Sequence, residues 1–344
     1  MPNYNMKQWL DSLYGIKEKK PLPILSFPCI SLLDVTVREL IMDSELQAKG
    51  MKMIADSVDS AASVSFMDLS VEAECFGAKI VVYDDEVPTI KECIIRNANE
   101  AEALKIPLIG SARTGICLDA ISRATKLITD RPILAGMIGP FSLAARLLGV
   151  SDIMMYCYDE PDMVHTVLKK VTAFLIAYAK AFKVTGANGI VVAEPVAGLL
   201  SPALEEEYSS PYVKQIVDAV QDDYFLVVYH NCGDRTPNML SSILSTGCAA
   251  YHFGNAVDIQ RDVIAKVPEK TIIMGNIDPV GVLCMGTAEQ VKNETVELME
   301  KCTVYPNFVL SSGCDIPPNT PWQNVKTFFD ASKEFYKKQG VYDR

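Results

Sequence analysis

The strongest constraint on the fold is a repeated alternation along the chain. Short β-branched apolar runs end abruptly in Gly, Pro, Asn or Asp, and longer amphipathic stretches separate most of them. This is the pattern of repeated βα units around a buried parallel sheet. Eight such runs are predicted as strands, which is the number of strands in a TIM barrel. They span residues 23–27, 62–69, 132–138, 189–194, 225–230, 249–253, 271–276 and 307–311.

The predicted architecture is α/β, with a single (β/α)8 TIM barrel built from one domain over residues 1–344. An N-terminal extension precedes the first predicted strand. An insertion separates the second and third strands, with a hairpin in AKIVVYDDEVP and an additional strand in IPLIG. A doubly wound open sheet is the alternative. That fold loses support because no strand-to-helix turn carries a glycine-rich nucleotide motif.

Composition excludes several classes of function. Lys plus Arg number 32 against 43 Asp plus Glu, so the net charge is −11, which argues against nucleic-acid binding. The longest uncharged apolar stretch, 133–145, contains Gly and Pro and is too short for a membrane span. No secretory signal is recognisable at the start, and the 10 cysteines lack the spacing of a disulfide scaffold. We therefore expect a cytoplasmic protein with reduced thiols.

The segment VVYHNCGD carries the clearest chemical signal. His230 and Cys232 stand two residues apart at the end of a predicted strand, so their side chains should share one face. Cys314, in SSGCDIPP after the last strand, is the natural third ligand of a metal site. One imidazole and two thiolates favour zinc, and three protein ligands leave a fourth position open for catalysis.

Other polar residues end the predicted strands. Glu194 could hold the open metal position or accept the proton of an incoming thiol, and the alternative is a helix-capping or solvated carboxylate. Asp68 and Asn276 are candidates for binding a cofactor, and Asp278, like Glu194, is a candidate catalytic residue. For Asp278, an Asp-Pro turn is the competing explanation.

Three further features are candidates for binding. His252, in YHFGN, is expected to face the cavity, and Arg113, in the predicted loop SARTG, is a candidate for contacting an anionic group. The segment GPFSLAARLLG has the form of a strand-to-helix turn whose free amides could hold an anion.

Five segments together resemble the uroporphyrinogen decarboxylase superfamily, and within it the corrinoid-dependent methyltransferases. They are SFPCISLLDVTVREL, MDLSVEAECFGA, YHNCGD, MGNIDP and SSGCDIPPNTPW. The similarity covers residues 22–335, which we take as the core of the barrel. It implies zinc on His230, Cys232 and Cys314, and transfer of a methyl group from a methylated corrinoid, carried by a partner protein, to a thiol such as coenzyme M.

Two alternatives remain open at this stage. True uroporphyrinogen decarboxylases need no metal and carry an R-x-x-x-R segment after the first strand, which binds the substrate carboxylates. The matching stretch here, FPCISLLDV, has no arginine before Arg38. A decarboxylase is therefore the runner-up, and a non-catalytic corrinoid- or tetrapyrrole-binding barrel is the third hypothesis.

Overall fold

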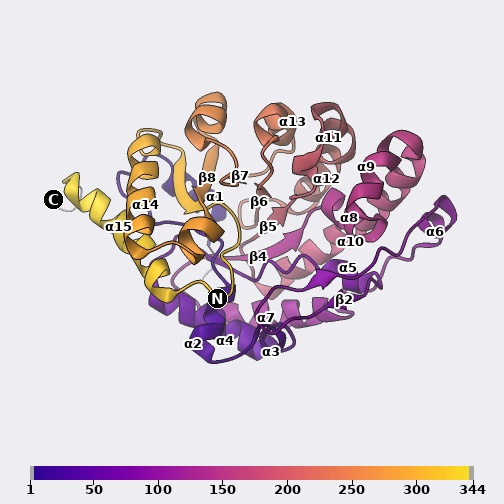
Figure 1. Cartoon of the computed structure of the whole chain (residues 1–344), viewed down its shortest axis with the longest axis horizontal. Coiled ribbons are helices and arrows are strands. Elements are labelled where there is room, and N and C mark those ends of the chain that lie inside the picture. The colour runs from indigo at the N-terminus through magenta and orange to yellow at the C-terminus, as the bar shows by residue number, and fades with distance from the viewer. Residues whose placement is uncertain (1–3, 341–344) are drawn as a thin grey trace.

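A computed structural model describes residues 4–340 and confirms the α/β barrel architecture. Seven parallel strands form one curled sheet in the order β1-β4-β5-β6-β7-β8-β9, and Figure 1 shows helices packed around its outside. The strands are β1 Ser63–Val64, β4 Ile133–Ile138, β5 Gly189–Ala193, β6 Leu226–Asn231, β7 Ala250–Phe253, β8 Ile272–Ile277 and β9 Phe308–Ser312. Six of the eight predicted strands are found within one residue of their expected bounds.

The helices alternate with these strands. The α-helices are α1 Met6–Leu13, α2 Ile30–Leu33, α3 Val37–Ile41, α4 Ser44–Ser57, α5 Val71–Cys75, α6 Ala98–Ala103, α7 Arg113–Leu127, α8 Pro140–Leu148, α9 Val150–Asp159, α10 Pro161–Thr185, α11 Pro202–Tyr208, α12 Ser210–Val220, α13 Leu240–Ser245, α14 Ala288–Cys302 and α15 Trp322–Lys338. Short 3-10 or π turns span η1 Phe27–Cys29, η2 Ala197–Leu199, η3 Thr236–Met239, η4 Ile259–Val263, η5 Ile264–Lys266 and η6 Pro279–Cys284. No helix in residues 4–340 is both long enough and apolar enough to cross a membrane.

Side-chain alternation along the strands separates two apolar regions. On β6, Leu226 and Val228 belong to the cluster that fills the barrel interior, whereas Val227 and Tyr229 pack in the layer between sheet and helices. Helix α1, the predicted N-terminal extension, adds Met6 and Leu13 to the interior cluster. Because side chains alternate with period two, the residues at 230 and 232 also face inward. The barrel thus has an apolar interior with polar groups at the carboxyl ends of its strands.

The first predicted strand, 23–27, is wrong as a regular strand. The extended segment 21–24 takes its place between the two edges of the sheet: the Leu22 amide donates to Leu310 O (2.9 Å), and Pro21 O accepts from the Ala61 amide (2.9 Å). Pro21 and Pro23 have no amide hydrogen, so a continuous ladder cannot form here. The segment still closes the gap between β9 and β1.

The second predicted strand is shorter than expected. Only Ser63–Val64 forms β1, and the chain then turns at Asp68, whose Oδ1 accepts from the Ser70 amide (3.0 Å). The insertion after it contains the predicted hairpin, with β2 Ile80–Val81 antiparallel to β3 Thr89–Ile90. The additional strand predicted in IPLIG is wrong: residues 106–110 form no strand, and Leu108 is 81% exposed, because no sheet edge lies beside it.

Candidate metal centre

Three side chains from two distant parts of the chain meet at the mouth of the barrel. One ligand atom each from His230, Cys232 and Cys314 lie within 4.8 Å of one another, and this is the one such group in residues 4–340. The distance from His230 Nε2 to Cys314 Sγ is 3.4 Å. In a tetrahedral zinc site, bond lengths of about 2.0 Å to nitrogen and about 2.3 Å to sulfur place these atoms roughly 3.5 Å apart. The spacing fits zinc.

The fold explains why these residues meet. His230 is the fifth residue of β6, and its neighbour Cys232 follows the strand on the same inward face. Cys314 follows β9, beside the gap that segment 21–24 closes. The loop after β7 presses against this site: a Cβ at Gly254 would lie 2.5 Å from Cys232 Cα. Only glycine lets the backbone pass this close.

A chain of hydrogen bonds behind His230 fixes which ring nitrogen carries the proton. Ser311 Oγ donates to Leu22 O (2.7 Å), so it accepts from His252 Nε2 (2.7 Å). His252 Nδ1 is then an acceptor, and His230 Nδ1–H donates to it (2.8 Å). His230 Nε2 is left with a free lone pair on the side of Cys314. This is the tautomer that a metal ligand requires.

Burial keeps His252 neutral. Desolvation, followed by the proximity of the His230 ring, lowers its pKa well below its ordinary value. The sequence analysis placed His252 among the residues that bind a cofactor. In the structure it stands behind His230, where it can orient the ligand.

The two cysteines of the cluster differ electrostatically from the buried thiols elsewhere. A hydrogen bond from the Cys314 thiol, supported by His230, lowers the pKa of Cys232 to about 4, and the same hydrogen bond raises the pKa of Cys314. The hydrogen bond therefore favours the thiolate on Cys232 over that on Cys314. Burial instead raises the pKa of five packed thiols to about 12, namely Cys29, Cys117, Cys157, Cys248 and Cys302. Among these thiols, Cys232 alone has its pKa lowered, which suits it to bind a cation.

Glu194 is placed as a helix cap. Its side chain is fully buried and accepts from the amides of Phe141 and Ser142 (both 2.9 Å) and from Ser142 Oγ (2.7 Å), at the start of α8. Burial raises its pKa to about 7. It is not part of the metal-ligand group. The amides of residues 141 and 142, which were expected to bind an external anion, therefore already donate to the Glu194 carboxylate.

Arg113 and Asp68 are paired with each other inside the protein. Arg113 is the first residue of α7, and its guanidinium forms ion pairs with Asp68 and with Glu74 (2.6 Å) while donating to Ser70 Oγ (2.8 Å). Its side chain is 4% exposed. Residues 111–115 were expected to form a loop, but α7 begins at Arg113. Arg113 and Asp68, both predicted to bind a cofactor, are paired with each other.

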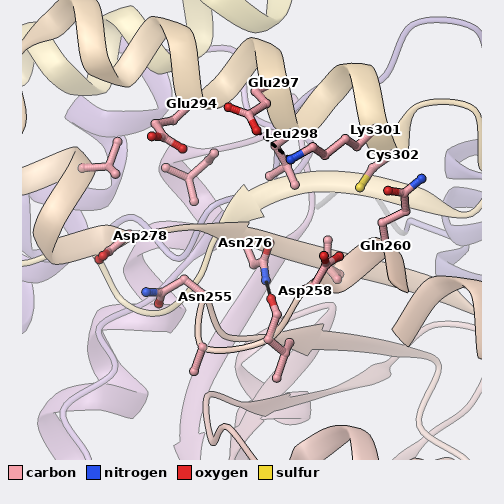
Figure 2. A pocket seen from close by; sticks show the side chains of 15 residues that line it. Asn255, Asp258, Gln260, Asn276, Asp278, Glu294, Glu297, Leu298, Lys301 and Cys302 are labelled. Carbon is pink, nitrogen blue, oxygen red and sulfur yellow. Dashed lines mark hydrogen bonds and ion pairs between the residues drawn. The ribbon is translucent and has the colours of Figure 1, made fainter. Parts of the chain in front are cut away.

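Asn276 and Asp278 hold the loops beyond β7 and β8. Asn276 Nδ2 donates to Gly254 O (2.8 Å) and Val257 O (2.9 Å), and Asp278 Oδ1 accepts from two amides at the start of η6 (both 2.9 Å). Figure 2 shows both facing a cavity of about 480 Å³ whose far wall is α14. None of the three candidate metal ligands lines that cavity.

The sequence analysis missed two groups at the mouth. Ser311 ends the hydrogen-bond chain behind His230, and a lone serine in a strand gives no sequence signal for such a role. Arg146 lines a second cavity of about 470 Å³, next to Asp315. Its signal was available: it is the one charged residue of α8, whose other residues are all buried.

Comparisons with known proteins identify the family of this chain. Residues 31–335 match the family described as uroporphyrinogen decarboxylase (URO-D). A methylcobamide:CoM methyltransferase MtbA from Methanosarcina acetivorans is 33% identical over 272 residues, 78% of each chain, and a uroporphyrinogen decarboxylase from Coxiella burnetii is 26% identical over 290 residues, 80% of this chain and 77% of the other.

A solved structure supports the fold. A methyltransferase from Methanosarcina mazei superposes with a TM-score of 0.86 at 24% identity, over 97% of this chain and 99% of the other. Together, the sequence match and the shared barrel show that this chain belongs to the uroporphyrinogen decarboxylase family, in its methyltransferase branch.

Proposed function

We propose that this protein is a zinc-dependent methyltransferase that moves a methyl group from a methylated corrinoid to a small thiol. The observation that carries the proposal is the convergence of His230, Cys232 and Cys314 at the barrel mouth, with the Nε2 lone pair of His230 left free. A nitrogen and two sulfurs in this arrangement form a three-ligand site that keeps one position for a reactant. Relatives named methylcobamide:CoM methyltransferases support the donor and acceptor classes.

The residues supply a site that fits this chemistry. Zinc bound there would lower the pKa of an acceptor thiol, so that its thiolate is available at neutral pH. His230 is held in the required tautomer by His252, and hydrogen bonding to Cys314 and His230 lowers the pKa of the Cys232 thiol. A methylated corrinoid presented at this mouth would supply the methyl group to the acceptor thiolate, and the electron pair of the carbon–cobalt bond would stay with the corrinoid. The thiol proton leaves to solvent.

We infer the corrinoid partner and the location from the same proposal. The three ligands lie at the carboxyl ends of strands, where barrel enzymes bind their reactants, so a corrinoid protein would dock over this face. A reduced cytoplasmic environment would keep both cysteines available as ligands.

The test combines metal content with turnover. Purified protein is analysed for metals and then assayed for demethylation of methylcobalamin with a panel of thiols and with tetrahydrofolate. We expect one zinc per chain and thiol-dependent demethylation. Both should be lost in Cys314→Ser, while circular dichroism shows a retained fold.

Other outcomes identify the alternatives. Decarboxylation of uroporphyrinogen by metal-free protein would replace the proposal with the decarboxylase function. Bound zinc without turnover of any acceptor would favour a corrinoid-binding barrel. Unfolding of Cys314→Ser together with metal loss would indicate a structural zinc site.

A further inference from the structure

A third cavity lies at the end of the barrel opposite to the metal centre. It has a volume of about 490 Å³, and its walls come from the segment after α1, from the ends of α14 and α15, and from the start of β9. Helices α14 and α15 lie side by side (Figure 1). Strand β9 begins with Phe308 in the cavity wall and ends with Ser312, two residues before Cys314. Four steps of about 3.3 Å separate the two ends of β9, so the cavity is roughly 13 Å from the mouth.

Two lysines line this cavity, and neither has a carboxylate partner. Lys17 and Lys19 come from the segment between α1 and the barrel. Within residues 4–340, no Asp or Glu lines the cavity, and no carboxylate oxygen lies within 4.0 Å of either ammonium group. The next lysine along the chain, Lys20, does form such a pair, with Asp59 (2.8 Å). The cavity is therefore cationic in a chain whose net charge is −11.

Lys19 is the buried member of this pair. It is 8% exposed, and its Nζ donates to Pro306 O (2.5 Å) and to Phe308 O (2.8 Å). An ammonium group has three N–H bonds, so one of them remains for a ligand. Burial lowers the pKa of Lys19 to about 8, and no acidic neighbour opposes this shift. Two neutral carbonyls thus replace only part of the water that this cation loses on folding.

Lys17 adds a second positive charge close to the first. It is exposed, and by itself it would be an ordinary solvated lysine. Its Cα is at most about 7 Å from that of Lys19, because two residues of chain cannot span more. Two ammonium groups held this close repel each other, and an anion between them would remove the repulsion.

The remaining wall of the cavity suits an organic group. Ile16 and Val304 are exposed apolar side chains, and Phe308 adds a buried aromatic ring. Tyr336 and Gln339 supply polar groups at the end of α15. A volume of about 490 Å³ lies within the range of about 300–1,000 Å³ that is typical of small-molecule sites.

We propose that this cavity binds a small phosphate monoester, with the phosphate on Lys17 and Lys19 and the organic group against Ile16 and Val304. A phosphate monoester carries a charge of about −1.5 to −2 at neutral pH, which matches two ammonium groups better than a monocarboxylate does. Lysine binds phosphate as a point charge and needs no fixed fork geometry. The inference is independent of methyl transfer, because the site is separate from the metal centre.

Titration calorimetry with phenyl phosphate tests the proposal on the purified full chain. We expect phenyl phosphate to bind the natural protein at least about fivefold more tightly than benzoate or inorganic phosphate. Its affinity should fall about fivefold or more in Lys17→Gln and about tenfold or more in Lys19→Gln. Lys20→Gln, the neighbouring lysine with a carboxylate partner, is the matched control and should change affinity less than about twofold. Lys17 has no partner to lose, so Lys17→Gln tests the site even if Lys19→Gln is unstable.

A labelling experiment locates the ligand. The natural protein is acetylated with an N-hydroxysuccinimide ester, with and without phenyl phosphate, and the modification of each lysine is measured by peptide mass spectrometry. We expect phenyl phosphate to slow acetylation of Lys17 at least about threefold and to leave Lys20 unchanged, because a bound phosphate covers only the first ammonium group.

Three outcomes would overturn the proposal. Absence of phenyl phosphate binding, or unchanged affinity in Lys17→Gln, would reject the site. Equal protection of Lys17 and Lys20 would show that the anion associates with surface lysines in general. Benzoate binding as tight as that of phenyl phosphate would reject the phosphate monoester as the ligand class.

Discussion

The two sides of the barrel mouth differ in whether their buried polar groups have hydrogen-bond and ion-pair partners. On the side of β6, β7 and β9, each hydrogen bond from Leu22 O to His230 has a defined donor and acceptor, and the series ends with a free lone pair. On the side of α5, α7 and α8, Arg113 forms ion pairs with two carboxylates, whereas the buried Nε of Arg146 has no hydrogen-bond partner. Paired groups hold the fold together, whereas a buried group without a partner carries a desolvation cost.

The largest expected effect concerns the metal side. Cys232→Ser or Cys314→Ser removes one of three ligands, and we expect zinc content to fall from one per chain to near zero, with methyl transfer reduced at least about 1000-fold. Metal analysis and the methylcobalamin assay measure both. Cys248→Ser, a buried cysteine outside the cluster, is the control. Full zinc retention in both variants would show that neither cysteine is needed to bind the metal.

The next effect concerns stability on the arginine side. Arg113→Met leaves Asp68 and Glu74 buried without their partner, so we expect a loss of about 3–5 kcal/mol in the free energy of unfolding. Arg146→Met breaks no ion pair and should leave stability unchanged or slightly higher. Urea denaturation of both variants measures the contrast. Equal destabilisation would show that the two arginines have the same structural role.

The hydrogen-bond chain behind His230 should affect metal affinity more weakly than the ligands do. His252→Phe removes the acceptor that fixes the His230 tautomer, and we expect zinc affinity to fall about 10–100-fold while stoichiometry at saturation stays at one. Competition with a chromophoric chelator measures the affinity. His165→Phe is the matched control, because His165 lies on α10 and contacts Tyr212. Unchanged affinity in His252→Phe would mean that the tautomer does not depend on this contact.

The smallest effect is a pH dependence on the arginine side. Glu72 is fully buried, and burial raises its pKa from 4.5 to about 7, although its Oε1 accepts from the Ile138 amide (3.1 Å). A carboxyl whose pKa is higher in the folded state stabilises the fold below the unfolded pKa, and this contribution is lost as pH rises through about 7. Glu72→Gln removes the dependence and keeps an acceptor for Ile138.

This variant is measured by unfolding at several pH values. Relative to the natural protein, Glu72→Gln should gain about 1–2 kcal/mol in unfolding free energy between pH 5 and pH 8. The exposed Glu297→Gln serves as the control. A constant difference across this range would show that Glu72 has no raised pKa in the folded protein.

Local patterns anticipated much of the fold. The buried strands have a continuous apolar signature, so six of them were located within one residue. The segment 21–24 was predicted as a regular strand, but its prolines lack the amide hydrogens that a strand ladder needs. Its hydrogen bonds to both sheet edges still place it in the barrel. IPLIG was misjudged because an apolar run forms a strand only where a partner strand is available.

The candidate site was anticipated unevenly. His230 and Cys232 are linked by a spacing of two, which a strand converts into a shared face. Glu194 and Arg113 were both recognised as charged residues near the mouth. No sequence pattern indicates that Glu194 accepts from two backbone amides or that Arg113 pairs with two carboxylates. Arg146 does stand out in the sequence as the one charged residue of an apolar helix, but the sequence does not show that its Nε has no partner.

The sequence by itself predicted the barrel and the candidate ligands His230, Cys232 and Cys314, because backbone periodicity and residue chemistry are local properties. Only the tertiary structure brought Cys314 within 4.8 Å of the other two, set the His230 tautomer through His252, and left Arg146 rather than Arg113 unpaired beside a cavity. Each of these depends on distances between residues far apart in the chain. The hydrogen bonds and charges of such residues are fixed only when folding removes water and brings them into contact.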